Sequence, residues 1–84
     1  MEQFETGMMA RSKSGHDAGK VYVITKVEEA YVYLVDGKVR TLETPKKKKK
    51  KHVQLIKESF DIQGATDVDI KRWIKIWNKE DNQN

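Results

Sequence analysis

Runs of β-branched and aromatic residues recur along the chain between residues 8 and 57, separated by residues that favour turns. This pattern is typical of short strands. The turns are marked by two glycines and an aspartate in residues 14–19, by two glutamates at residues 28–29, and by Asp36-Gly37, a pair that suits a type I′ hairpin. The strands are predicted at residues 8–13, 20–27, 30–35, 38–43 and 52–57. The lysines between the last two strands are expected to form a loop after Pro45.

The middle strands are apolar on both faces. On one strand Val21 and Val23 alternate with Tyr22 and Ile24, and the next strand repeats the pattern. In that strand Tyr31 and Tyr33 lie opposite Val32 and Leu34. Short antiparallel strands with tight turns predict a small barrel, which buries one of these faces and leaves the other to be covered.

Near residue 66 the spacing of apolar residues changes from the two-residue period of a strand to that of a helix. Thr66 is a suitable helix cap, and Asp67 and Asp69 favour the positive end of a helix dipole. An apolar stripe with helical spacing follows, formed by Ile70, Trp73, Ile74 and Trp77. We expect a helix over residues 67–79 whose stripe packs on the uncovered face of the barrel. Its opposite face is basic and carries Lys71, Arg72, Lys75 and Lys79. Residues 80–84 are expected to be a frayed end.

The length of 84 residues indicates one domain, residues 1–84, with the barrel over about residues 7–58. The chain contains no cysteine, which excludes disulfides and thiolate metal sites. The acidic start of the sequence does not resemble a secretory signal, and no apolar run is long enough to span a bilayer. A cytoplasmic protein is expected.

The net charge of +4 comes from one segment, the six consecutive lysines of residues 46–51. Without them, 11 basic residues would face 13 acidic ones. Such a run favours a phosphate backbone, which it would bind without reading sequence. The alternatives are a solvated loop, a nuclear localisation signal or contact with an anionic membrane surface. A loop of this kind predicts that exchange of all six lysines for glutamine leaves the fold intact.

A second candidate is the loop that reads SGHDAGK, residues 14–20. Its glycines permit close approach to a phosphate, and Ser14, His16 and Lys20 offer hydrogen bonds or charge. A tight turn between two strands would have the same composition. Asp17 is the residue that fits a phosphate contact least, although it could shape the turn.

Residues 7–24, GMMARSKSGHDAGKVYVI, resemble the KOW motif: a strand, a polar loop that ends in Gly-Lys, and an apolar strand. The continuation AYVYLVDGKVR, residues 30–40, is similar to KOW-bearing large-subunit ribosomal proteins of eukaryotes and archaea, with LVDG as part of the likeness. Small bacterial KOW proteins also end their barrel with a lysine run. The resemblance covers residues 7–57 and does not extend to the predicted helix.

The resemblance implies an SH3-like barrel that binds ribosomal RNA, with ribosomal proteins as further partners and neither a membrane nor a small-molecule substrate. Arg40 is the best candidate for a contact with defined geometry, because a guanidinium binds phosphate with two hydrogen bonds or stacks on a base. The predicted RNA-binding residues are Lys13, Ser14, His16, Lys20, Lys38, Arg40, Lys46, Lys47, Lys48, Lys49, Lys50, Lys51 and His52. The alternative function is a protein-interaction module of the translation or transcription machinery that uses Trp73 and Trp77.

Nothing in the sequence indicates an enzyme. The two histidines, His16 and His52, lie in polar or basic segments, and no nucleophile has an evident histidine and acid partner. No phosphate-binding loop of the GxxxxGK[ST] type is present. No cofactor or metal is expected.

Overall fold

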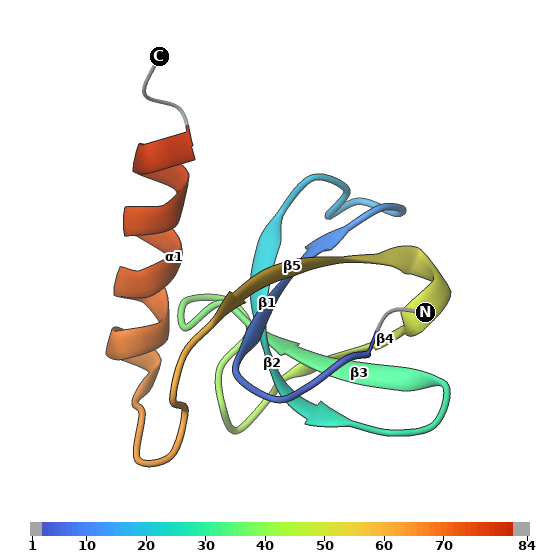
Figure 1. Cartoon of the computed structure of the whole chain (residues 1–84), viewed down its shortest axis with the longest axis horizontal. Coiled ribbons are helices and arrows are strands. Elements are labelled where there is room, and N and C mark those ends of the chain that lie inside the picture. Colours follow the sequence, from blue (N-terminus) through green and yellow to red (C-terminus); the bar gives the residue numbers. More distant parts are fainter. Residues whose placement is uncertain (1–2, 82–84) are drawn as a thin grey trace.

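The computed structural model describes residues 3–81 and shows one strongly curved antiparallel sheet with a helix beside it (Figure 1). The elements are β1 (Met8–Ser12), β2 (Val21–Val27), β3 (Tyr31–Val35), β4 (Lys46–Lys49), the 3₁₀ turn η1 (Lys50–His52), β5 (Val53–Ser59) and α1 (Asp67–Asp81). The strand order is β4-β3-β2-β1-β5. The predicted class, mainly β with five short strands in a small barrel-like sheet and a C-terminal helix, is confirmed.

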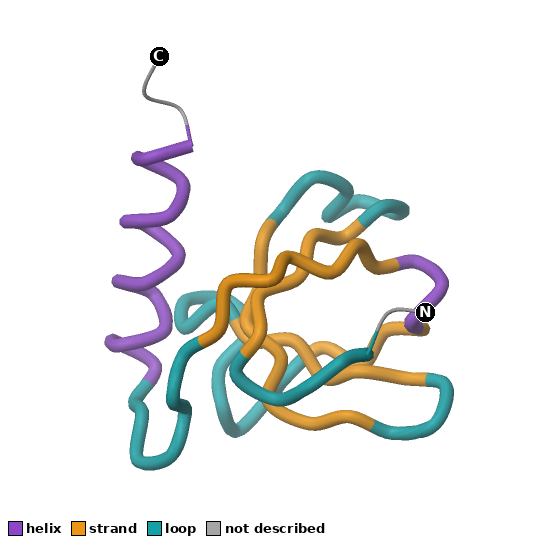
Figure 2. Tube along the Cα trace, viewed as in Figure 1, coloured by secondary structure: helices purple, strands orange, loops and turns teal. Residues whose placement is uncertain are grey.

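Both faces of β2 are buried over Val21–Ile24, whereas on β3 Val32 and Leu34 are buried and Tyr31 and Tyr33 are half-buried. Inside the curved sheet, Ile24, Val32 and Leu34 form the centre of one core cluster. On the outer side, α1 covers the sheet with Ile70 and Ile74. These two side chains pack against Met9, Val21, Val23 and Val35. Figure 2 shows the helix as a separate layer against one side of the strands. The apolar stripe of α1 therefore docks on the sheet, as its spacing predicts.

The N-terminus of α1 is capped as expected. The backbone N–H of Asp69 donates to the Thr66 hydroxyl at 3.2 Å, and the Asp69 carboxylate accepts from the backbone N–H of Thr66 at 3.0 Å. These reciprocal bonds satisfy donors that the first helical turn leaves free. The helix extends to Asp81 rather than residue 79, so residues 80 and 81 of the predicted frayed end are helical. The rest of the predicted frayed end, residues 82–84, lies outside the described residues.

The predicted strand over residues 38–43 is wrong. These residues belong to a loop in which the Asp36 carboxylate accepts the backbone N–H groups of Lys38, Val39 and Arg40, at 2.8–3.0 Å. Because the side chain of Asp36 satisfies these donors, they need no partner strand. Val39 is 70% exposed, so the apolar residues of this segment do not mark a buried strand.

The predicted lysine loop is also wrong. Residues 46–49 form β4, which pairs antiparallel with β3, and residues 50–52 form η1. The last strand accordingly begins at Val53, one residue later than expected. The lysine run thus occupies the sheet position that the sequence assigns to residues 38–43.

Gly37 fixes the loop after β3 against the helix. Its φ is +78°, and a Cβ at this position would collide with the Asp67 carbonyl oxygen. Gly64 has almost the same φ, +79°, but open space around it. We expect Gly37→Ala to lower the free energy of unfolding by about 1 kcal/mol more than Gly64→Ala, because only Gly37→Ala adds overpacking to backbone strain. Chemical unfolding of the two variants tests this. Equal losses would contradict close packing of the loop on α1.

In the described part of the chain, no helix combines the length and the apolar composition that crossing a bilayer requires.

Candidate nucleic-acid interface

The two-residue period of a strand divides the lysine run into two sets. In the register of β3 with β4, Lys46 lies opposite Leu34 and Lys48 opposite Val32, both on the face that contributes to the interior. Lys47 lies opposite Tyr33 and Lys49 opposite Tyr31, on the outer face. We call Lys46 and Lys48 the inner lysines. The outer lysines are Lys47, Lys49, Lys50 and Lys51.

The inner lysines converge on Asp17, a buried residue of the loop between β1 and β2. The Lys46 ammonium lies 3.1 Å and the Lys48 ammonium 3.3 Å from its carboxylate oxygens. The hydroxyls of Ser12 and Tyr22 donate to the same carboxylate at 3.0 and 3.2 Å. These four donors satisfy the buried charge, so Asp17 shapes and anchors the loop from within.

Burial raises the pKa of Asp17, but the hydrogen bonds from Lys46, Ser12 and Lys48 outweigh burial and hold that pKa far below its ordinary value. The carboxylate is therefore charged at every physiological pH. Burial and the nearby charge of Asp17 raise the pKa of Tyr22 to about 12, so its hydroxyl remains a donor. The centre is an ion-pair cluster in which one charged carboxylate contacts two ammonium groups.

The outer lysines lie beside two aromatic rings. The Lys47 ammonium lies 4.5 Å from the ring centroid of Tyr31 and 5.8 Å from that of Tyr33. It also pairs with Glu28 at 3.7 Å, an exposed contact of small energetic value. Within residues 3–81, Lys49, Lys50 and Lys51 make no ion pair. Uncompensated charge therefore gathers on the outer face of β4 and along η1.

The loop between β1 and β2 adds exposed groups next to this edge. Lys13 and His16 are exposed. The backbone N–H of Lys13 donates to the His52 carbonyl of η1 at 2.9 Å, which joins the start of the loop to the end of the lysine run. Ser14 is half-buried, and its carbonyl accepts from Lys48 at 3.0 Å. The fold thus brings the two predicted RNA-binding segments together.

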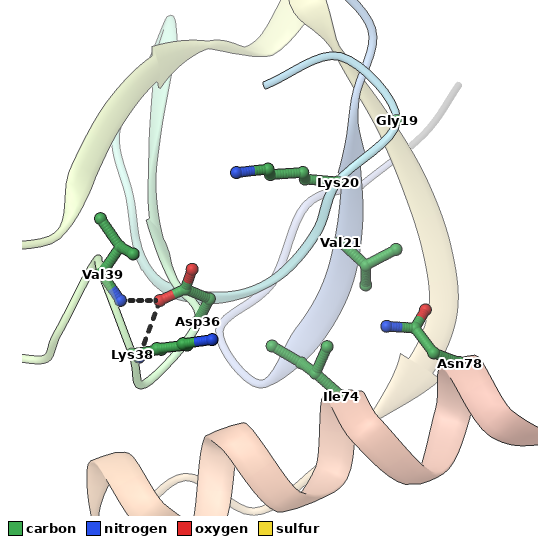
Figure 3. A pocket seen from close by; sticks show the side chains of 8 residues that line it. All are labelled: Gly19, Lys20, Val21, Asp36, Lys38, Val39, Ile74 and Asn78. Carbon is green, nitrogen blue, oxygen red and sulfur yellow. Dashed lines mark hydrogen bonds between the residues drawn. The ribbon is translucent and has the colours of Figure 1, made fainter. Parts of the chain in front are cut away.

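Lys20 and Lys38 line a different hollow, next to α1. Figure 3 shows their side chains entering from two loops, with Ile74 and Asn78 of the helix forming the floor. Arg40 lies in the same loop as Lys38, and its backbone carbonyl accepts from the N–H groups of Asp36 and Gly37. In the described part of the chain, no hydrogen bond or ion pair connects Lys38 or Arg40 to β4.

The sequence indicated that Asp17 could shape its turn but not that it pairs with Lys46 and Lys48. It also gave no sign that Tyr31 and Tyr33 belong to the candidate interface. The alternation of these tyrosines with Val32 and Leu34 placed the two pairs on opposite faces, but the lysine run was not predicted to form the partner strand of β3. Among residues 3–81, no cluster of three or more histidines and carboxylates could hold a metal ion.

Fold and surface together define a small barrel-like β domain with one basic edge flanked by tyrosines. No protein-family model matches the chain, and no curated protein matches it.

Proposed function

We propose that the protein binds RNA through the outer lysines and the exposed residues of the loop between β1 and β2. The observation that carries this proposal is the division of the lysine run. The fold pairs two of the lysines with a buried carboxylate and leaves Lys49, Lys50 and Lys51 without an ion pair among residues 3–81. Adjacent unpaired cations repel one another, and phosphates that neutralise them relieve this repulsion while the RNA releases its own condensed counterions.

The KOW resemblance of residues 7–57 directs the proposal to ribosomal RNA, and to a cytoplasmic protein of the ribosome or associated with it. The contact is electrostatic, and lysines bind the phosphate backbone without sequence specificity. The sheet positions the backbone of Lys47 and Lys49, and η1 positions that of Lys50 and Lys51. Edge lysines also deter pairing of β4 with a strand of another molecule. That effect does not account for Lys50 and Lys51, which lie beyond the strand.

Sedimentation of a native lysate tests this function. We expect the protein to sediment with the large ribosomal subunit at low salt and to be released at high salt. For purified RNA, the four outer lysines are expected to contribute about −3 to −4 to the slope of log affinity against log salt. Retention on the subunit in high salt would indicate a buried structural protein. Absence from ribosomes at both salt concentrations would contradict a ribosomal role.

The second candidate is binding of a protein partner by the helix. Trp73 stacks on Phe60 with ring centroids 4.7 Å apart, and Arg11 lies over Trp77 at 5.4 Å, so both tryptophans contact the sheet and its flanking segment. A shallow hollow remains between them and Ile76, which is 49% exposed. This hollow is the surface that such a partner would use.

A further inference from the structure

We propose that a hollow beside Tyr31 binds one unpaired nucleotide of the RNA. This inference rests on the proposed function and makes it more specific, because it names single-stranded segments as the preferred ligand. The hollow lies where the turn between β2 and β3 faces the end of β4 and η1. Its volume is about 490 Å³, within the range typical of small-molecule sites. It is lined by Glu29, Ala30, Tyr31, Lys49, Lys50 and Lys51.

The lining combines the groups that a nucleotide requires. Tyr31 contributes an aromatic ring, on whose flat face a base can stack. Three lysines offer cations to the phosphates on either side of that base. The backbone fixes this arrangement, because Tyr31 lies opposite Lys49 in the sheet and the N–H of Lys50 donates to the Ala30 carbonyl at 2.9 Å. The two walls of the hollow are therefore held together without a ligand.

The Tyr31 ring is accessible to a ligand. The side chain is half-buried, and the ammonium over its ring belongs to Lys47, whose side chain is 50% exposed. A flexible lysine can turn from the ring to a phosphate when a base takes its place. Glu29 is exposed at the rim, where its carboxylate can accept hydrogen bonds from the N–H groups of a base.

A duplex cannot use this hollow. Its bases are stacked within the helix and offer no free face to Tyr31, whereas unpaired bases can be splayed out onto aromatic side chains. The lysines, in contrast, contact phosphates of either form. The ring should therefore account for a preference for single strands, and the charges for affinity toward both forms.

The test measures affinities of the full chain and of two variants for a short single-stranded RNA without self-complementarity and for a duplex of the same length. We expect the wild type to prefer the single strand. Tyr31→Leu should weaken single-strand binding about fivefold or more and leave duplex binding unchanged. Tyr31→Phe, which keeps the ring, should bind as the wild type does. Equal losses for both RNAs, or no loss, would overturn the proposal.

A second measurement uses only the wild type and so remains decisive if Tyr31→Leu does not fold. Single-stranded RNA that carries 4-thiouridine is crosslinked by light, and the modified residue is mapped by mass spectrometry. A crosslink at Tyr31 or its hollow supports the site, and crosslinks only elsewhere overturn it. Absence of binding to either RNA would contradict the proposed function itself, whereas binding without a contribution from Tyr31 would contradict the hollow alone.

Discussion

Replacement of Asp17 by Ala is expected to lower the free energy of unfolding by about 3 kcal/mol. The substitution removes the only carboxylate that the inner lysines contact in the described structure and takes from the Tyr22 hydroxyl its acceptor, while the Ser12 hydroxyl keeps the Ser14 carbonyl at 3.1 Å. Removal of one partner from a buried ion pair typically costs about 3–5 kcal/mol. The lower end applies because the Lys46 side chain, 28% exposed, can turn to water. Urea unfolding measures the loss.

Two controls isolate the charge of Asp17. Asp17→Asn keeps the shape and one acceptor, so its loss should lie between those of the wild type and Asp17→Ala. Glu28→Gln also removes one carboxylate charge, from exposed contacts at 3.7 Å with Lys26 and Lys47, and should cost less than about 1 kcal/mol. Equal unfolding free energies of Asp17→Ala and Glu28→Gln would show that the ion pairs between Asp17 and the inner lysines contribute little to stability.

The same centre predicts how stability depends on pH. The pKa of Asp17 is lowered in the folded protein, so the unfolded chain binds more protons as pH falls toward the ordinary value of 3.8. The contribution of Asp17 is therefore complete above that value and is lost as pH falls below it. Asp17→Asn should lack this pH-dependent contribution. The difference in unfolding free energy between the wild type and Asp17→Asn should therefore become smaller as pH falls below 3.8.

Exchange of the four outer lysines for glutamine is expected to lower RNA affinity by about two orders of magnitude or more at 0.1 M salt. Each lysine removed takes away one site of counterion release. The fold should persist, because these side chains lie on the outer face of β4 or in η1 and their contacts with Glu28 and the tyrosines are partly exposed. A circular dichroism spectrum unlike that of the wild type would contradict this assignment of the outer face.

The matched control removes four charges from the far side of the helix, by exchange of Lys71, Arg72, Lys75 and Lys79 for glutamine. These residues are exposed on α1. Their exchange changes the net charge equally, so an equal loss of affinity would show that only the total charge matters.

Exchange of the inner pair, Lys46 and Lys48, should instead destabilise the fold. Because Lys46 and Lys48 pair with the buried Asp17, the structure leads us to expect, against the expectation from the sequence, that exchange of all six lysines disturbs the fold.

The elements that local patterns specify could be predicted from the sequence. Alternation of apolar residues located β2 and β3, and helical spacing located α1 together with its buried stripe. The loop between β1 and β2 and the lysine run were each predicted as RNA-binding candidates from their residue types, and the hydrogen bond from Lys13 to His52 joins them in the fold. These features depend on burial and on residue types that favour one conformation.

The identity of the fourth strand could not be predicted, because a tertiary contact decides it. Lysine has low strand propensity, and adjacent like charges disfavour pairing. In β4, Asp17 compensates the inner lysines from a loop that is 29 residues away from Lys46 in the sequence. The segment 38–43 has better strand residues, but Asp36 binds its backbone and Asp67 accepts the N–H of Leu42 at 2.8 Å. The Asp36 bonds are local, but the ion pairs of Asp17 and the bond from Leu42 to Asp67 join residues far apart in the sequence and have no local signature.

The most direct test of the proposed RNA interface is the salt dependence of RNA affinity, measured in parallel for the wild type and for the variant with glutamine at residues 47, 49, 50 and 51. The number of phosphates that the protein neutralises sets the slope of log affinity against log salt, whatever the RNA sequence. We expect the variant's slope to be shallower by about 3 while its unfolding curve stays close to that of the wild type. Parallel slopes from two folded proteins would show that the outer lysines do not bind phosphate.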